Sequence, residues 1–143
     1  MTEEQANVTT LENAYRLWHD SKAGSVAHWL SLMTDDVHFR STTGGVGGAG
    51  FRHEGRSRDD VAQYFDQMAT EWEMLRFTPE EFIAQDARVA VLGTCEWRSR
   101  RTGTVAVSPF AQFFTFRNGR ITRVVELFDS AAAMAARGAT PAS

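Results

Sequence analysis

Apolar residues recur at intervals of three and four positions through much of the first half of the chain, which is the spacing of one helix face. The pattern predicts a helix over about residues 10–20, where Thr9 and Glu12 resemble a capping box. A short helix is expected after Ser25 and a long one after Ser57, whose following carboxylates favour a helix start. The apolar stripes of these helices are Val8, Leu11, Tyr15 and Trp18; Val26, Trp29, Leu30 and Met33; and Val61, Tyr64, Phe65, Met68 and Trp72.

The second half of the chain changes to the alternating pattern that is typical of strands. Asn118-Gly119 lies between two such runs and is the strongest short-range hairpin signal. Pro79 interrupts an earlier run, which indicates an edge position or a bulge. Residues 130–137 are rich in alanine and predict a terminal helix. The expected strands are residues 75–83, 88–98, 104–116 and 121–128, preceded by a short strand over residues 37–41 with Val37, Phe39 and Ser41 on one side.

One carboxylate falls on an apolar strand face. Side chains alternate along a strand, so Glu126 lies on the same face as Val124 and Phe128. If this face lines an enclosed cavity, desolvation should raise the pKa of Glu126 toward the range that is useful for proton transfer. The alternative is an ion pair with an arginine such as Arg123 or Arg98 at the rim of the sheet.

The composition narrows the classes of function. With 15 basic and 18 acidic residues and no basic run, the chain is not expected to bind nucleic acid. Cys95 is the only cysteine, which excludes an internal disulfide, and the four histidines lack paired ligand spacing, so no metal site is expected. The N-terminus is polar and acidic, and no apolar stretch approaches the length of a membrane span. A soluble cytoplasmic protein without membrane contacts is therefore expected.

The length fits a single domain over residues 1–143, with a core of about residues 8–137 and a disordered tail over residues 138–143. Residues 42–50 are almost all small, which predicts a mobile loop. The glycines within this loop match the letters of a dinucleotide fingerprint. That motif works only between a strand and a helix, and no helical run follows here, so no cofactor is expected.

Several segments together resemble a known family. They are residues 22–39, 55–61, 113–121 and 125–129. By their order and spacing the chain resembles the SnoaL-like group of the nuclear transport factor 2-like superfamily, a group that includes polyketide cyclases. Ketosteroid isomerases and limonene-epoxide hydrolases are more distant relatives. The resemblance covers about residues 11–136.

The resemblance implies an α+β fold of the nuclear transport factor 2-like, or cystatin-like, type. In this fold a cone-shaped, curved antiparallel sheet wraps around a long helix and encloses a deep apolar pocket. The family commonly forms homodimers through the outer sheet face. The fold hosts enzymes, binding modules and transport factors alike, so it does not settle activity.

The catalytic set of the ketosteroid isomerases is not retained. The position of their base falls on Ser41, which cannot act as a carboxylate base. Their oxyanion-stabilising acid falls on Ala111, and their tyrosine falls near Leu17, although Tyr15 lies on the same predicted helix. The resemblance therefore does not imply steroid isomerisation.

The catalytic set of the epoxide hydrolases is also incomplete. Their arginine and aspartate map to Gly93 and Cys95, and their water-holding tyrosine and asparagine map to Phe39 and Ser41. Only their second acid has a counterpart, in Glu126, and one carboxylate cannot run that push-pull hydrolysis.

The polyketide cyclases use an acid/base aspartate in the C-terminal part of the sheet. Glu126 or Asp129 could fill this role, and a helix cap is the alternative for Asp129, which directly precedes the alanine-rich segment.

The functional interpretation is a small-molecule-binding protein with Glu126 as the general acid/base of a cofactor-independent isomerase, cyclase or hydratase-type reaction. The alternative is a non-catalytic ligand-binding or accessory protein with the same pocket. The expected ligand is small and largely apolar or aromatic. A second polar group that converges on Glu126 would favour the enzyme. The expected substrate-binding residues are Tyr15, Trp18, Phe39, Ser41, His53, Cys95, Trp97, Ala111, Phe113, Val124 and Phe128.

An apolar outer sheet face is also expected. Simple alternation turns Gln112 away from Ala111 and Phe113, which places it on the outer side. The alternative is that a bulge turns Gln112 inward, where it could hydrogen-bond a ligand. The outer sheet face as a whole is too apolar to be exposed to water, so a homodimer is expected to bury it. The residues assigned to this face are Phe110, Gln112, Phe114 and Phe116, with Val125 and Leu127 on the next strand.

Overall fold

The computed structural model describes residues 1–42 and 54–138. The expected mobile loop over residues 42–50 lies outside these residues except for Thr42, and His53 also lies outside them. The elements in chain order are α1 (Glu3–Asp20), α2 (Val26–Ser31), β1 (Met33–Ser41), β2 (Glu54–Gly55), α3 (Arg58–Glu71), β3 (Trp72–Gln85), β4 (Arg88–Ser99), β5 (Val105–Arg117), β6 (Arg120–Phe128) and α4 (Ser130–Arg137).

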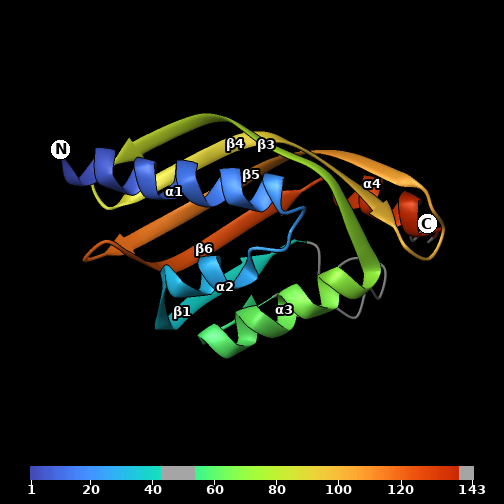
Figure 1. Ribbon diagram of the computed structural model, residues 1–143, viewed down its shortest axis with the longest axis horizontal. Coiled ribbons are helices and arrows are strands. Elements are labelled where there is room, and N and C mark those ends of the chain that lie inside the picture. The colour runs from blue at the N-terminus through green and yellow to red at the C-terminus, as the bar shows by residue number, and fades with distance from the viewer. Residues whose placement is uncertain (43–53, 139–143) are drawn as a thin grey trace.

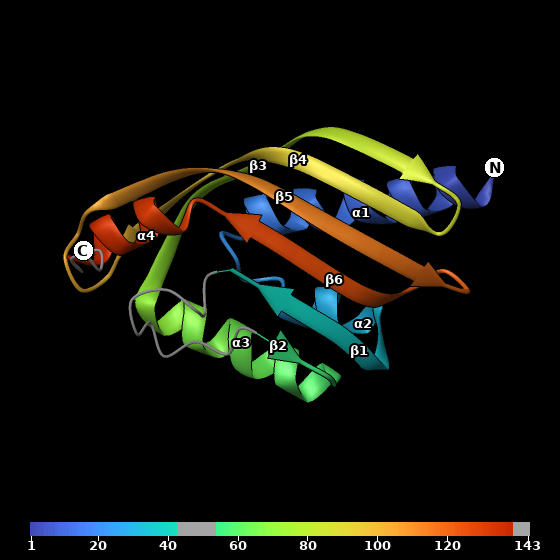
Figure 2. The same ribbon diagram turned by 180° about the vertical axis from the view of Figure 1, so that it is seen from behind.

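A curved, unclosed sheet of six strands forms the body of the molecule, and α1 and α2 lie on one face of it (Figure 1). Seen from behind, the strands lie in front of these two helices (Figure 2). Helix α1 packs mainly against β3 and also contacts β4, whereas α3 contacts β1, β2 and α2. The expected α+β class with a curved sheet and covering helices is confirmed.

The strand order is β2-β1-β6-β5-β4-β3. Strands β3 to β6 form the expected antiparallel meander. The expectation of a purely antiparallel sheet is wrong at one pair, because β1 runs parallel to β6. A parallel pair needs a long crossover connection, which the chain supplies through β2, α3 and the meander.

The hairpin between β5 and β6 turns at the two residues that the sequence indicated. Asn118 and Gly119 have φ values of 51° and 78°, which is the pair of positive angles that a type I′ turn requires. Pro79 lies on β3 at the edge of the sheet, and the β3–β4 register shifts between Pro79 and Glu81. The structure has both features that Pro79 indicated as alternatives, the edge position and the bulge.

The first helix begins earlier than the apolar stripe indicated. Thr2 accepts a hydrogen bond from the backbone N–H of Gln5, and the Gln5 side chain accepts one from the backbone N–H of Thr2, so the capping box lies here. The expected box at Thr9 and Glu12 is wrong. Glu12 is an exposed residue well inside α1.

The second strand of the hairpin carries an irregularity that decides which side chains face inward. Thr115 pairs with Arg123, but Phe116 pairs with Ile121, so Thr122 is an extra residue in β6. An extra residue in one strand shifts the pairing by one position, so beyond it different residues of the two strands share a sheet face. Without it, Gln112 would lie opposite Val125, and with it Gln112 lies opposite Glu126.

The expected facing of β5 is therefore wrong. Phe110, Phe114 and Phe116 are buried in the core, whereas Phe113 is 44% exposed on the other face. Gln112 is buried as well, with 8% of its surface exposed. On β5, the residues that were expected on the outer face are therefore buried, and the residues that were expected to face inward lie on the outer face. Val89 and Val91 on β4 are buried on the inner face. Cys95 and Trp97 on β4 and Val124 and Glu126 on β6 also face inward, as expected.

Candidate functional site

Glu126 is a buried carboxylate in the middle of the inner sheet face. It lies opposite Gln112 of β5 on one side and opposite Ser41 of β1 on the other. Only 6% of its surface is exposed. The two neighbouring strands thus fix its backbone, and the covering helices exclude water from its side chain.

Both carboxylate oxygens of Glu126 accept hydrogen bonds from side chains. The Tyr64 hydroxyl, from α3, donates to Oε1 at 2.6 Å, and the Gln112 amide Nε2 donates to Oε2 at 2.7 Å. Ser41 Oγ lies 3.4 Å from the Tyr64 hydroxyl. The Tyr15 hydroxyl, from α1, donates to Gln112 Oε1. More than one polar group therefore converges on Glu126, from both the sheet and the helices.

Burial raises the pKa of Glu126 above its ordinary value of 4.5, and hydrogen bonds from Tyr64, Ser41 and Gln112 work in the opposite direction. Among the residues that the structure describes, no arginine or lysine forms a salt bridge with Glu126. Arg98 pairs with Glu73 at 3.1 Å, and Arg123 is exposed. Among the described residues, Glu126 therefore does not form the ion pair that the sequence left open as the alternative.

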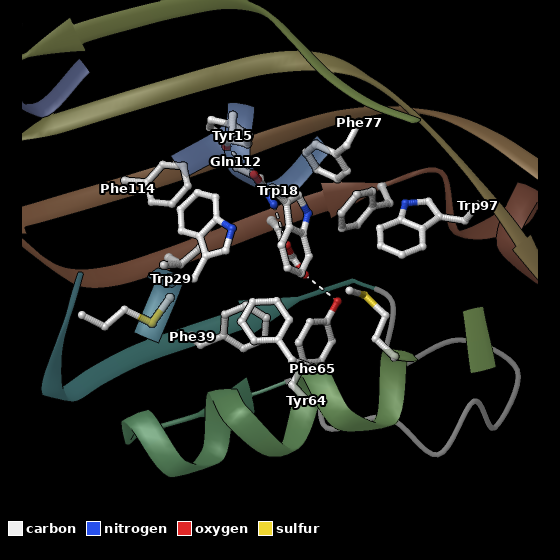
Figure 3. Close-up of a pocket in the computed structure, with 15 residues that line it drawn as sticks. Tyr15, Trp18, Trp29, Phe39, Tyr64, Phe65, Phe77, Trp97, Gln112 and Phe114 are labelled. Carbon is white, nitrogen blue, oxygen red and sulfur yellow. Dashed lines mark hydrogen bonds between the residues drawn. The ribbon is translucent and has the colours of Figure 1, made fainter. Parts of the chain in front are cut away.

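Glu126 and Gln112 form the polar part of a cavity whose remaining wall is almost wholly aromatic and apolar. Figure 3 shows side chains from α1, α2, α3 and the sheet around this space. The cavity has a volume of about 40 Å³. The lining residues are Tyr15, Trp18, Trp29, Met33, Phe39, Tyr64, Phe65, Met68, Phe77, Trp97, Gln112, Phe114, Val124, Glu126 and Phe128.

No group of three or more His, Cys, Asp or Glu in residues 1–42 and 54–138 is arranged to hold a metal ion. None of the helices in the same part of the chain is long and apolar enough to cross a membrane.

The model of the SnoaL-like domain matches residues 11–124, which is most of the chain. The chain belongs to the SnoaL-like domain family. No protein with a curated description matches the sequence.

Solved structures agree with this assignment. A nuclear transport factor 2-like protein of unknown function from Burkholderia pseudomallei has a TM-score of 0.83 at 26% identity, over 97% of this chain and 100% of that chain. TerC, which was co-crystallised with polyporic acid, has a TM-score of 0.77 at 26% identity, over 94% and 99% of the two chains. A candidate polyketide cyclase from Xanthomonas campestris has a TM-score of 0.73 at 16% identity, over 95% and 99%, and shows the fold alone.

Six of the expected substrate-binding residues of this SnoaL-like protein line the cavity. They are Tyr15, Trp18, Phe39, Trp97, Val124 and Phe128. Ser41 is buried beside Tyr64 rather than in the lining. His53 lies outside the described residues. What these side chains bind stays a prediction.

For two expected site residues the prediction is wrong, because they lie on the outer face of the sheet. Ala111 and Phe113 face away from the cavity, because the bulge at Thr122 turns Gln112 inward in their place. Ala111 lies opposite Leu127 and Phe113 opposite Val125, both on the outer face.

Cys95 lies on the inner sheet face but outside the cavity lining. Its thiol donates to the Ser108 carbonyl oxygen at a sulfur–oxygen distance of 3.6 Å. Burial raises the pKa of Cys95 to about 12, so the group stays a neutral thiol at ordinary pH. This environment is that of an inert packing residue.

Asp129 is a helix cap. Its side chain accepts a hydrogen bond from the backbone N–H of Ala132 at 3.0 Å, at the start of α4. It does not line the cavity. Of the two carboxylates that the sequence left open for the acid/base role, only Glu126 faces the enclosed space.

Two side chains that hydrogen-bond Glu126 were not among the expected site residues. Tyr64 was assigned only to the apolar stripe of α3, since helical spacing cannot show that its hydroxyl reaches across to β6. Gln112 was placed on the outer face by simple alternation, and the structure has the alternative, in which a bulge turns it inward. An uncharged polar residue within the otherwise apolar run Phe110, Phe114 and Phe116 was the one signal for it.

Proposed function

We propose that this protein is a small-molecule-binding SnoaL-like protein that catalyses a cofactor-independent isomerisation, cyclisation or hydration, with Glu126 as the general acid/base. The observation that carries the proposal is a buried carboxylate with a raised pKa, held by Tyr64 and Gln112 in an aromatic cavity. A carboxylate whose pKa is raised is a stronger base than an exposed glutamate.

The chemistry that fits this arrangement is proton transfer next to a carbonyl group. The Glu126 carboxylate removes a proton from the carbon, and the electron pair of the C–H bond moves into the carbonyl to form an enolate. The Tyr64 hydroxyl has one proton, which it donates to the Glu126 carboxylate at rest. Once Glu126 carries the abstracted proton, this hydroxyl can donate to the enolate oxygen instead and stabilise it. Return of the proton from Glu126 to another carbon completes an isomerisation. In a cyclisation the enolate carbon bonds to a second carbonyl carbon, the π electrons of that carbonyl move to its oxygen, and the proton on Glu126 passes to the resulting alkoxide.

The cavity sets a condition on binding. Pockets for drug-sized ligands measure roughly 300–1,000 Å³, and this cavity has about 40 Å³. A ligand larger than a few atoms therefore needs side chains to move. Met33 and Met68 in the wall are flexible and can change rotamer at low cost. We expect binding to be accompanied by rearrangement of this wall.

The wall chemistry and one similar protein support an aromatic ligand. Three tryptophans line the cavity, so the ligand can stack on them or meet their edges. TerC, at 26% identity, was co-crystallised with polyporic acid. Polyporic acid is therefore a reasonable first probe for this chain.

The test combines binding with proton exchange. Quenching of tryptophan fluorescence would report binding of polyporic acid and of a panel of aryl ketones, and proton NMR in D₂O would report exchange at the carbon next to the carbonyl. Glu126→Gln keeps the shape of the side chain but cannot transfer a proton. We expect binding within about twofold of wild type and a loss of exchange or turnover of about a hundredfold or more.

A matched control is Glu96→Gln, which changes a partly exposed carboxylate that is paired with Arg76 at 3.2 Å outside the cavity. It should leave exchange and binding unchanged. Equal activity of Glu126→Gln and wild type would contradict the catalytic role. Binding by the wild type without any exchange or turnover would instead support the alternative, a non-catalytic ligand-binding protein with the same pocket.

We further propose that the outer sheet face forms a homodimer. Two cross-strand rows carry apolar side chains on this face: Leu92, Ala111 and Leu127 in one, and Ala90, Phe113 and Val125 in the other. Leu127 and Phe113 are each 44% exposed, and Leu92 is 37% exposed. A contiguous apolar surface of this kind is characteristic of a protein interface.

A further inference from the structure

Tyr15 is fully buried on α1, although it carries a hydroxyl group. Its ring is fixed by neighbouring aromatic rings: the centroid of Trp29 lies at 5.3 Å in an edge arrangement, and that of Phe77 lies at 5.9 Å in a stacked one. The hydroxyl is directed at Gln112 Oε1, to which it donates a hydrogen bond. Figure 3 shows the two side chains next to each other at the edge of the cavity.

The Gln112 side chain is an amide, so its two ends have opposite hydrogen-bonding character. Because Oε1 accepts from Tyr15, the donor end Nε2 must face the other way, where it meets Glu126 Oε2 at 2.7 Å. A flipped amide would present an oxygen to the carboxylate. It would also leave the buried Tyr15 proton without the acceptor that it has now, which is costly in a dry interior.

We propose that Tyr15 is a positioning residue that acts through Gln112: it fixes the amide orientation, so that Glu126 is held in the form of a proton acceptor. The proposal rests on the function proposed above and names the direction of its first step. Tyr15 itself touches neither Glu126 nor the reacting atoms in this account.

The direction of the first step restricts the substrate class. Donors directed at both oxygens stabilise the charged form of the carboxylate, so Glu126 rests without a proton and its first step is to accept one. The ligand should therefore present an acidic C–H or O–H, as a carbonyl compound or an enol does, and not a group that must be protonated first.

Two properties of Tyr15 support this role. Burial, and to a lesser extent the nearby charge of Glu126, raise the pKa of the Tyr15 hydroxyl well above its ordinary value of 10.0. Tyr15 therefore remains a neutral donor throughout the ordinary pH range. The ring is also held on several sides, so the hydroxyl cannot follow the amide if Gln112 rotates.

The test is a double-mutant cycle on the pKa of Glu126, measured from the side-chain carboxyl ¹³C shift of glutamate-labelled protein. Tyr15→Phe removes the hydroxyl and keeps the ring, and Gln112→Met removes the amide and keeps the length. Each single change should raise the pKa of Glu126 by about half a unit to one unit, the size expected when a neutral hydrogen bond is lost. In the Gln112→Met background, Tyr15→Phe should have no further effect.

Two results would overturn the proposal. One is a Tyr15→Phe protein in which the pKa of Glu126 does not change. The other is a shift of equal size in the Gln112→Met background, which would mean that Tyr15 acts directly or through packing. Glu54, whose pKa is lowered by His38 on the far side of β1, titrates in the same spectra and should not move.

If the double variant does not fold, the side-chain amide protons of Gln112 give a second reading. They should exchange slowly with solvent in wild type and faster in Tyr15→Phe, and unchanged exchange would count against the proposal. These measurements need no substrate. They can fail while the Glu126→Gln test succeeds, and the reverse also holds, so the two proposals are judged separately.

Discussion

Gly93 shows how a single residue shapes the sheet below the cavity. A Cβ atom added at this position would lie 2.2 Å from the Thr78 carbonyl oxygen and 2.6 Å from Cζ of Phe110. Phe110 lies opposite Gly93 on β5 and fills the space where a side chain would be. The position that corresponds by resemblance to the arginine of the epoxide hydrolases therefore cannot hold any side chain here.

The prediction is that Gly93→Ala destabilises the fold by about 1–3 kcal/mol or more, because the overlap involves backbone as well as a packed ring. Gly103→Ala is the matched control. Gly103 has a φ of +77° and open space around it, so alanine there costs only about 1–2 kcal/mol of backbone strain. Urea unfolding measures both variants. If Gly93→Ala were as stable as wild type, the close approach would be wrong.

At the scale of the elements, hydrophobic patterns predicted most of the structure. The four meander strands, the capping of α3 by Ser57, the hairpin turn and α4 all lie where local signals indicated them. These features depend on residues that are near one another in the sequence. Local chemistry is sufficient to specify them.

The candidate site could be predicted only in part, for a physical reason that lies in one element. Glu126 was found because alternation along β6 is local. Gln112 was assigned to the wrong sheet face because the β5–β6 register depends on the extra residue Thr122. The residue types around Thr122 do not indicate a bulge. Tyr64 and Tyr15 approach the site from helices, and only tertiary packing brings them there.

At the scale of the whole molecule, the corrected facing of β5 changes which residues should form the dimer. The surface to test consists of Phe113, Leu127 and Leu92 rather than Phe110 and Phe114, which are core residues. Phe113→Lys should abolish self-association, because burying an unpaired charge in an apolar interface is unfavourable. Sedimentation velocity at micromolar concentration should show a dimer for wild type and a monomer for the variant.

Leu17→Lys is the control for this experiment. Leu17 is 39% exposed on α1, away from the outer sheet face, so its replacement should leave the dimer intact. A wild-type protein that sediments as a single chain would contradict the proposed interface. A Phe113→Lys protein that stays dimeric would place the interface elsewhere.

The buried carboxylate also has a consequence for stability. Burial raises the folded-state pKa of Glu126 above the unfolded value, near 4.5. The folded protein therefore binds more protons than the unfolded chain between these two values. The stability that Glu126 contributes is fully present below pH 4.5 and is lost as the pH rises through the folded-state pKa. The molecule thus gives up part of its stability near neutral pH because this group lies in a dry site.

The central claim is that Glu126 is a desolvated acid/base and not a structural ion pair. It is tested most directly by titrating the carboxyl ¹³C signal of Glu126 in the wild-type protein, assigned by its absence in Glu126→Gln. The account predicts a midpoint above 4.5, because desolvation outweighs the hydrogen bonds from Tyr64, Ser41 and Gln112. A midpoint at or below 4.5 would contradict it, since that value would mean that the charged form is stabilised as in an ordinary ion pair.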